Sequence, residues 1–410
     1  MKRTVITGMG ALTPVGRDVR TTWRALLEGR SGIGPVTLFD AADSPVRIAG
    51  EISGFDPGSL LRHKVSRRSA RFSQLAVAAA REAVADARLE IGEGNADRVG
   101  VAINTAVAGI VPAEQNVRLL GARGARAVSP MFVPGMIPNM PACEVAIDLG
   151  VHGPVIAGSL ACASGNHAVL EAGRLIREGE ADIVLAGGTD AAISEVMFAG
   201  LSTMGALSRR NDEPEAASRP FDRDRDGFVY GEGAVVFVVE SECHAAARGA
   251  VPYAEIAGGA LTSDAFHVCA PEPSGRYAAE ALRRCLRRSE LEPADLGYVC
   301  AHGTSTLAND RIEARVLREV LGPAAGSVPV SSPKSMVGHM IAAAGALSVL
   351  VCALAMRDGV IPPTINLDTP DLECELEHVR GKPRVTAVRA SVANAFGFGG
   401  QNCVVALRAV

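Results

Sequence analysis

The stretch PVIAGSLACASGNHAV, residues 154–169, joins a short apolar run to a turn of small residues and an alanine-rich helical pattern. The stretch VPVSSPKSMVGHMIAA, residues 328–343, repeats this plan in the second half of the chain. Short, continuous apolar strands that alternate with helices indicate βαβ units and mostly parallel sheets buried on both faces. We therefore predict an α/β fold in which the two halves of the chain are duplicates, divided near residue 250.

The rest of the chain fits this duplicated plan. Helical patterns such as 72–89 and 167–179 lie between the strand-like runs, and no proline- or serine-rich linker separates the halves, which indicates one rigid body. The charged segment 208–228 is typical of a solvated surface loop, with a role at the mouth of a site as the alternative. The predicted strands are 4–10, 98–104, 154–161, 181–189 and 234–240, then 253–261, 296–303, 328–335, 390–397 and 403–409.

The composition excludes several classes of function. The 410 residues are 48% hydrophobic and 21% charged, with a formal net charge of -4, which gives no reason to expect a nucleic-acid partner. Nine scattered cysteines without a C-x-x-C pair argue against disulfides or zinc and predict a cytoplasmic protein. The N-terminus shows no signal segment, and the apolar run 341–356 is too short to span a membrane, so it predicts a buried helix.

Cys162 stands where the first of these strands gives way to its helix. The unpaired N–H groups and the positive dipole end of a helix N-terminus stabilise an anion, which lowers the pKa of a thiol and makes it nucleophilic. Small neighbours leave room for a substrate. Taken alone, Cys162 could equally be a buried structural cysteine, because free cysteines are often core residues.

Two histidines occupy similar positions in the second half. His302 follows the strand-like GYVC, and His339 follows the strand of 328–335. Each alone could be a core or surface histidine, but loops at the carboxyl ends of parallel strands are where α/β folds gather their sites. Together with Cys162 they predict one active site.

A glycine-rich segment, NAFGFGGQN at 394–402, could bring backbone N–H groups close to a substrate. A tight turn and a phosphate cradle are the alternatives, although the segment lacks the lysine or the helix that phosphate sites need. The early GMGALTPVG, residues 8–16, matches a dinucleotide fingerprint only loosely.

These motifs resemble those of the elongating β-ketoacyl-acyl-carrier-protein synthases. The matching motifs are ACASG around Cys162, HGTST around His302, PKSMVGH with Lys334 and His339, and GFGG at 397–400. They occur in order and at family spacing over nearly the whole chain. The resemblance implies a duplicated thiolase-type five-layer α-β-α-β-α sandwich, usually dimeric. Its N-terminal half, 1–250, would carry the cysteine, and its C-terminal half, 251–410, both histidines, the lysine and the GFGG loop.

The resemblance also implies a mechanism. Cys162 takes an acyl chain from acyl carrier protein as a thioester, and a malonyl extender on carrier protein loses CO2 and attacks it, which adds two carbons. Neutral His302 and His339 donate hydrogen bonds to the extender's thioester oxygen, while Lys334 orients the site electrostatically. The backbone N–H groups of Cys162 and Phe398 form the oxyanion hole, and the Phe398 ring gates the acyl pocket.

Further roles follow from the same resemblance. No cofactor of the enzyme's own is expected, because phosphopantetheine arrives on the carrier protein. The implied residues are Asp310 and Glu313 as partners of Lys334; Thr304, Thr306 and Cys269 for pantetheine; Val107, Phe132 and Leu201 for the acyl pocket; and Arg62, Lys64, Arg67 and Arg68 for carrier-protein docking.

Several positions depart from the housekeeping fatty-acid enzymes. Cys300, Ser348 and Ala395 stand where related enzymes carry the oxygen ligands of a structural monovalent cation, so no metal is expected. Cys269 replaces a threonine, and Val107 stands where a larger isoleucine is frequent, which predicts a roomier pocket. These changes favour a synthase of type II polyketide or specialised fatty-acyl biosynthesis.

Three alternatives stay open at this point. One is the housekeeping synthase II of fatty-acid elongation, and another is a non-catalytic chain-length-factor type subunit, which would lack the cysteine that is present here. The chain could also act as a homodimer or as the catalytic half of a heterodimer with such a factor. A degradative thiolase is disfavoured, because Cys403 lies beyond the GFGG region.

Overall fold

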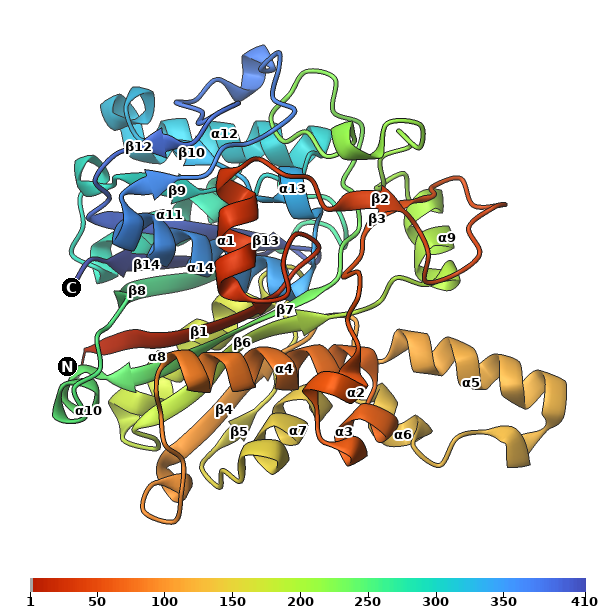
Figure 1. The fold of residues 1–410 in the computed structure, drawn as a ribbon. Coiled ribbons are helices and arrows are strands. Elements are labelled where there is room, and N and C mark those ends of the chain that lie inside the picture. The colour runs from red at the N-terminus through yellow and green to blue at the C-terminus, as the bar shows by residue number, and fades with distance from the viewer. Residues whose placement is uncertain (1–2) are drawn as a thin grey trace.

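A computed structural model describes residues 3–410, without the side chain of Lys64. Ten strands form one mixed sheet in the order β10-β9-β13-β14-β8-β1-β7-β6-β4-β5 (Figure 1). Two small ribbons, β2–β3 and β11–β12, lie outside it. The strands are β1 (Thr4–Leu12), β2 (Ile33–Pro35), β3 (Ile48–Gly50), β4 (Val99–Asn104), β5 (Val155–Ile156), β6 (Ile183–Asp190), β7 (Gly233–Ser241), β8 (Ala254–Ser263), β9 (Tyr298–Cys300), β10 (Val330–Ser331), β11 (Val360–Ile361), β12 (Arg384–Val385), β13 (Ala390–Gly397) and β14 (Gln401–Arg408).

The large sheet consists of two copies of one topology. The N-terminal copy runs β5-β4-β6-β7-β1 and the C-terminal copy β10-β9-β13-β14-β8, so each has its third, second, fourth, fifth and first strand in that order. The strand directions also repeat: the first two pairs are parallel and the last two antiparallel. The copies join through the antiparallel pair β1–β8, and we call them the N-terminal sheet and the C-terminal sheet. This repetition confirms the predicted duplication of the fold.

The prediction of mostly parallel sheets was wrong. Among the described strands of the large sheet, four of the nine neighbouring pairs are parallel: β4–β5, β4–β6, β9–β10 and β9–β13. The apolar runs have the same appearance in either direction, because both faces of the sheet are covered. Between β13 and β14 only residues 398–400 connect the strands, and so short a connection allows only an antiparallel pair.

Helices complete a sandwich of five layers (Figure 1). Helices α4 (Arg71–Asp86) and α7 (Met140–Leu149) cover the outer face of the N-terminal sheet, and α11 (Arg276–Arg288) and α12 (Leu307–Leu321) that of the C-terminal sheet. Between the two sheets lie α8 (Ser164–Glu178) and α14 (Ala342–Asp358), so the predicted fold class is confirmed. The remaining α-helices are α1 (Val19–Leu27), α2 (Pro57–Leu60), α3 (His63–Arg68), α5 (Ile110–Arg123), α6 (Phe132–Met136), α9 (Glu195–Thr203), α10 (Glu242–Ala247) and α13 (Lys334–Val337).

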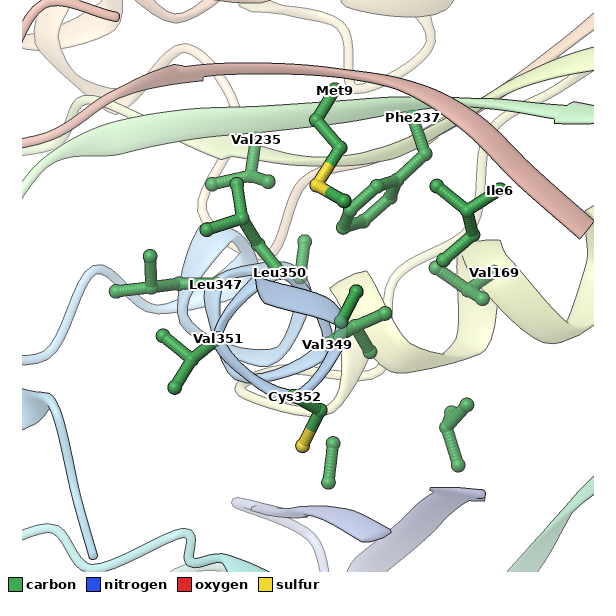
Figure 2. Close-up of a cluster of buried hydrophobic side chains, with 14 of the residues drawn as sticks. Ile6, Met9, Val169, Val235, Phe237, Leu347, Val349, Leu350, Val351 and Cys352 are labelled. Carbon is green, nitrogen blue, oxygen red and sulfur yellow. The ribbon is translucent and has the colours of Figure 1, made fainter. Parts of the chain in front are cut away.

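The central layer brings the two halves of the site together. Helix α14 is buried all round: its Leu350 points toward Met9 of β1 and Val235 of β7, and its Val349 lies on the side of α8 (Figure 2). A Cβ on Gly165 of α8 would lie 2.5 Å from the Ala342 carbonyl oxygen of α14, so only glycine allows this close approach. As a result, the first turns of both helices meet at the centre of the molecule. None of the described helices is long and apolar enough to cross a membrane.

The charged segment 208–228 differs from the solvated loop that its composition favours. Phe221, Asp222 and Arg225 are buried in it, and residues 226–228 reach the central cavity. The Arg225 guanidinium lies 2.8 Å from the Asp371 carboxylate and 3.6 Å from that of Asp310. These ion pairs compensate the buried charge. The segment therefore fits the alternative prediction, a role at the mouth of a site, because residues 226–228 line the cavity.

Candidate active site

A cavity of about 660 Å³ opens where loops from both halves of the chain meet. Its N-terminal wall includes residues 161–162 and 226–228, and its C-terminal wall includes 302–309 and 396–398. The cysteine and both histidines predicted from the sequence line this cavity, so the fold brings them together across more than 170 residues of chain.

Cys162 occupies a tight turn just before α8. The preceding Ala161 has a φ of 45°, in the left-handed region that non-glycine residues rarely adopt. The turn also touches the GFGG loop, since a Cβ on Gly397 would lie 2.7 Å from the Leu160 carbonyl oxygen. Cys162 is 7% exposed and lines the cavity together with Gly397 and Phe398 of that loop.

The two imidazoles stand next to the thiol. The Sγ atom of Cys162 and one ring nitrogen each of His302 and His339 all lie within 4.8 Å of one another. The centroids of the two imidazole rings are 5.5 Å apart, and the ring planes meet at an angle of 82°. The Ile341 N–H donates to Nδ1 of His339 at 3.1 Å, so a neutral His339 carries its proton on Nε2. That Nε2 atom is buried without a partner among the described residues and can donate to a bound oxygen.

Burial controls the protonation of these groups. It lowers the pKa of His302 and of His339 well below the usual range, and the nearby Lys334 ammonium adds to this effect. Both imidazoles are therefore neutral at physiological pH, as their predicted role requires. Burial also lowers the pKa of Lys334, while Cys300 and the Glu313 carboxylate act in the opposite direction.

The thiol itself differs from the sequence-based expectation. Burial raises the pKa of Cys162 to about 11, although the Lys334 ammonium and the backbone N–H groups of Phe398 and Cys162 lower it in part. The helix N-terminus therefore does not produce a lowered pKa in the free protein, because desolvation of the thiolate outweighs it. The same two N–H groups lie close to Sγ. Their role as an oxyanion hole stays a prediction.

Two carboxylates of α12 support the histidine loop from behind. The Glu313 carboxylate accepts hydrogen bonds from the N–H groups of His302, at 2.8 Å, and Gly303, at 2.7 Å. The Asp310 carboxylate accepts from the Thr304 N–H at 3.0 Å. Both side chains are buried behind the cavity wall. They hold the loop through its backbone, in addition to the electrostatic influence on Lys334 that the sequence predicts.

Most of the remaining predicted residues lie at the cavity. Thr304, Thr306 and Cys269 line it, with the two threonine hydroxyls 2.9 Å apart. Val107 and Leu201 also line it, and Phe398 does so while 40% exposed. Phe132, in α6, is not among the residues that line the cavity of this chain.

The predicted docking residues lie away from the cavity. Arg67 and Arg68 are exposed in the last turn of α3. The Arg62 guanidinium is 3.6 Å from the buried Asp148 carboxylate, so part of its charge is already compensated. The side chain of Lys64 lies outside the described part of the structure.

The residues at the predicted cation positions are all buried. Cys300 lies beside Cys352 and Ser348, and hydrogen bonds from these groups and Tyr298 outweigh burial and lower its pKa. Ala395 offers no side-chain ligand. The absence of a structural cation stays a prediction.

Sequence reasoning missed three residues. Asp190 is buried at the end of β6, and its carboxylate accepts hydrogen bonds from the Thr105 hydroxyl and the Ala342 N–H, which ties the cavity wall to α14. Arg225 anchors the mouth segment, and Tyr230 lines the cavity. The aspartate after a buried strand was a signal for the first; the other two depend on contacts between segments far apart in the sequence.

A duplicated thiolase-type sandwich with a cysteine and two neutral histidines at its centre defines a condensing acyltransferase. Residues 1–245 match the family model of the β-ketoacyl synthase N-terminal domain, and residues 253–368 match that of its C-terminal domain. The chain belongs to the β-ketoacyl synthase family. The predicted family and enzyme class are confirmed.

Similar proteins include 3-oxoacyl-[acyl-carrier-protein] synthases and a ketosynthase of a type II PKS. The chain is 44% identical to 3-oxoacyl-[acyl-carrier-protein] synthase 2 of Synechocystis sp. over 99% of its length and 98% of the relative's. It is also 44% identical to the protein of that name in Coxiella burnetii, covering 100% and 99%.

Two solved structures share the whole fold. One is a type II PKS acyl-carrier protein in complex with its ketosynthase bound to the hexaketide (TM-score 0.93, 31% identity, 100% of both chains). The other is the ishigamide ketosynthase/chain length factor (TM-score 0.93, 34% identity, 100% of this chain and 99% of that chain).

Proposed function

We propose that this protein joins an acyl chain held on Cys162 to a malonyl unit carried by acyl carrier protein, in a decarboxylative Claisen condensation. The observation that carries this proposal is the mutual distance, within 4.8 Å, of the Cys162 sulfur and the ring nitrogens of His302 and His339 in one cavity. The curated relatives, whose names describe 3-oxoacyl-acyl-carrier-protein synthesis, support it.

The first step transfers the acyl chain. The Cys162 sulfur attacks the carbonyl carbon of the acyl thioester, the bond to the carrier's sulfur breaks, and the proton of the cysteine thiol passes to that leaving thiolate. The N–H groups of Phe398 and Cys162 stabilise the negative oxygen of the tetrahedral intermediate. The positive charge of Lys334 stabilises thiolate character on Cys162, which its burial otherwise opposes.

The second step forms the new carbon–carbon bond. The bond to the malonyl carboxylate breaks and CO2 leaves, while the electron pair forms an enolate whose oxygen accepts hydrogen bonds from neutral His302 and His339. The enolate carbon then attacks the acyl thioester on Cys162 and displaces its thiolate, which takes up a proton. The product is a β-ketoacyl chain longer by two carbons.

The carrier supplies what the protein lacks. Thr304 and Thr306 at the cavity mouth offer hydroxyls for the phosphopantetheine arm, and the protein needs no cofactor of its own. Exposed Arg67 and Arg68 on α3 offer positive charge to the acidic carrier, an attraction that salt weakens. The solved complex of an acyl-carrier protein with its ketosynthase supports this partner class.

The pathway is the finer part of the proposal. Val107 and Cys269, at the cavity wall, favour a synthase for polyketide or specialised acyl chains, and the two solved ketosynthases support it. The names of the 44%-identical relatives favour the housekeeping alternative of fatty-acid elongation. A non-catalytic chain-length-factor subunit is disfavoured by the presence of Cys162. The nine free cysteines support action in the reducing cytoplasm.

Intact-mass spectrometry tests the reaction directly. The protein and its Cys162→Ala variant are each incubated with a panel of acyl carrier proteins that bear different acyl chains. We expect a mass gain equal to one acyl group in the wild type and none in the variant. Acylation that needs a co-expressed related chain would indicate an obligate heterodimer. No acylation in either case would contradict the proposed enzyme and favour the scaffold subunit.

A further inference from the structure

Tyr230 lies beside the catalytic histidine on the wall of the central cavity. Its segment runs next to His339, whose N–H donates to the Val229 carbonyl at 2.7 Å and whose carbonyl accepts from the Gly231 N–H at 2.9 Å. The Tyr230 carbonyl accepts from the Gly50 N–H at 2.8 Å. These backbone bonds on both sides of the residue fix where its side chain starts, and the side chain lines the cavity.

The hydroxyl of Tyr230 is buried without a hydrogen-bond partner in the described part of the protein. The residue is only 1% exposed. Two other tyrosine hydroxyls do have hydrogen-bond partners. The Tyr298 hydroxyl lies 2.8 Å from that of Ser331, and the Tyr253 hydroxyl donates to the Asp86 carboxylate at 3.0 Å. Buried tyrosine hydroxyls usually find a partner, so the exception at the cavity points to a ligand.

Among the described buried side-chain nitrogen and oxygen atoms without a partner, two belong to residues that line the cavity: Nε2 of His339 and the hydroxyl of Tyr230. The function already gives the first of them an oxygen of the bound thioester to hold. The second is a buried donor without a partner on a residue of the same cavity wall, and no oxygen is yet assigned to it.

The surroundings make a hydrogen bond there strong and selective. The Tyr230 ring lies 5.9 Å from that of Phe198 and 6.4 Å from that of Phe228, and Leu201 and Ile341 line the same wall. Burial raises the pKa of the phenol well above its usual value, so it stays protonated and can donate. In such an apolar wall, a purely hydrocarbon chain leaves the hydroxyl unsatisfied, whereas an oxygen on the chain satisfies it.

We propose that Tyr230 is a specificity-determining residue that donates a hydrogen bond to an oxygen on the bound acyl chain, and that the enzyme's substrates are oxo- or hydroxyacyl chains. The inference rests on the proposed function and adds the substrate class. A site built to hydrogen-bond a substrate oxygen discriminates against the analogue that lacks it, because its own polar group is then left buried and unpaired.

The test compares acylation rates of Cys162 by intact-mass spectrometry. The donors are octanoyl, 3-oxooctanoyl, 5-oxooctanoyl and 3-hydroxyoctanoyl chains on one acyl carrier protein. We expect the wild type to prefer at least one oxygenated chain over octanoyl. Tyr230→Phe should lower the ratio of that rate to the octanoyl rate roughly 3- to 10-fold, as the loss of one hydrogen bond does. The acyl chain that reacts fastest shows at which carbon the hydrogen-bonded oxygen lies and whether it belongs to a ketone or a hydroxyl group.

Tyr253→Phe is the matched control, since it removes a tyrosine hydroxyl far from the cavity and should keep the wild-type rate ratios. Equal ratios in wild type and Tyr230→Phe would overturn the inference while the proposed function stands. No acylation of the wild type by any donor would overturn both. The variant should also melt at or above the wild-type temperature, because it loses only an unpaired hydroxyl. A clear fall in melting temperature would show that the hydroxyl has a partner in the free protein, which contradicts the inference.

Discussion

At the scale of single residues, Cys162 is the point where opposing electrostatic effects meet. Burial opposes ionisation of its thiol, whereas the Lys334 ammonium and the N–H groups of Phe398 and Cys162 favour it. Burial is the larger effect, and the pKa of about 11 keeps the thiol protonated in the free protein at neutral pH. A protonated resting thiol is less reactive toward stray electrophiles, because the thiolate is the nucleophile.

The pH dependence of thiol alkylation tests this balance. The rate at which iodoacetamide modifies Cys162 should rise about tenfold per pH unit from neutral pH, because only the thiolate reacts and its fraction grows until the pH reaches the pKa of about 11. Lys334→Met should slow the reaction at each pH, since loss of the positive charge raises the thiol pKa further. A plateau near neutral pH would contradict the dominance of burial.

At the scale of elements, α12 acts as the support of the histidine loop. Asp310 and Glu313 lie one turn apart on this helix, and their carboxylates accept hydrogen bonds from the backbone N–H groups of residues 302–304. Glu313 also accepts the side-chain amide of Asn394 from β13 at 3.1 Å. One carboxylate therefore links the helix, the loop and the strand that leads to GFGG, so a change there should disturb all three.

Substitution of Glu313 by alanine measures that support. Glu313→Ala leaves three buried donors, on His302, Gly303 and Asn394, without their acceptor. Each unsatisfied buried group costs about 1–3 kcal/mol, so the free energy of unfolding should fall by about 3 kcal/mol or more. Urea denaturation measures this fall. Glu319→Ala on the same helix removes an exposed carboxylate paired with Arg283 and should change stability by less than about 1 kcal/mol. Equal effects would contradict the supporting role.

At the scale of the whole molecule, the duplicated sheet ends in an open edge at β5. Its Val155 is 41% exposed, and Ile147 of the neighbouring α7 is 73% exposed. Helix α5 projects from the body of the molecule and exposes Val117 and Leu120 (Figure 1). An unpaired strand edge with exposed apolar side chains favours pairing with another chain. In the dimer that the sequence predicts, a partner chain, either a second copy or a related subunit, would cover this surface.

Sedimentation velocity tests the predicted dimer. The wild type should sediment with twice the mass of one chain, and Val155→Asp should shift it toward the monomer, because a charge would then be buried at the interface. Leu372→Asp places the same charge at an exposed apolar position on the other half and should remain dimeric. A monomeric wild type that assembles only with a related chain would instead indicate the heterodimer.

Local sequence signals predicted much of the chemistry. Cys162, His302 and His339 each follow a strand at a turn of small residues, and such turns are read from neighbouring letters. The duplicated α/β plan was visible for the same reason, because strand and helix patterns repeat within short windows. The direction of each strand could not be predicted in this way, since a strand covered on both faces has the same apolar pattern whether it runs parallel or antiparallel to its neighbour.

The sequence by itself determined the duplicated alternation of strands and helices and which cysteine, histidines and lysine to expect at the site, because these signals depend on residues adjacent in the chain. Only the tertiary structure decided the protonation of these groups, the anchoring of the mouth segment by Arg225 and the open hydroxyl of Tyr230. Burial, ion pairing and an unpaired donor depend on which distant segments pack together. The packing of α8 against α14 at Gly165 brings those segments to one cavity.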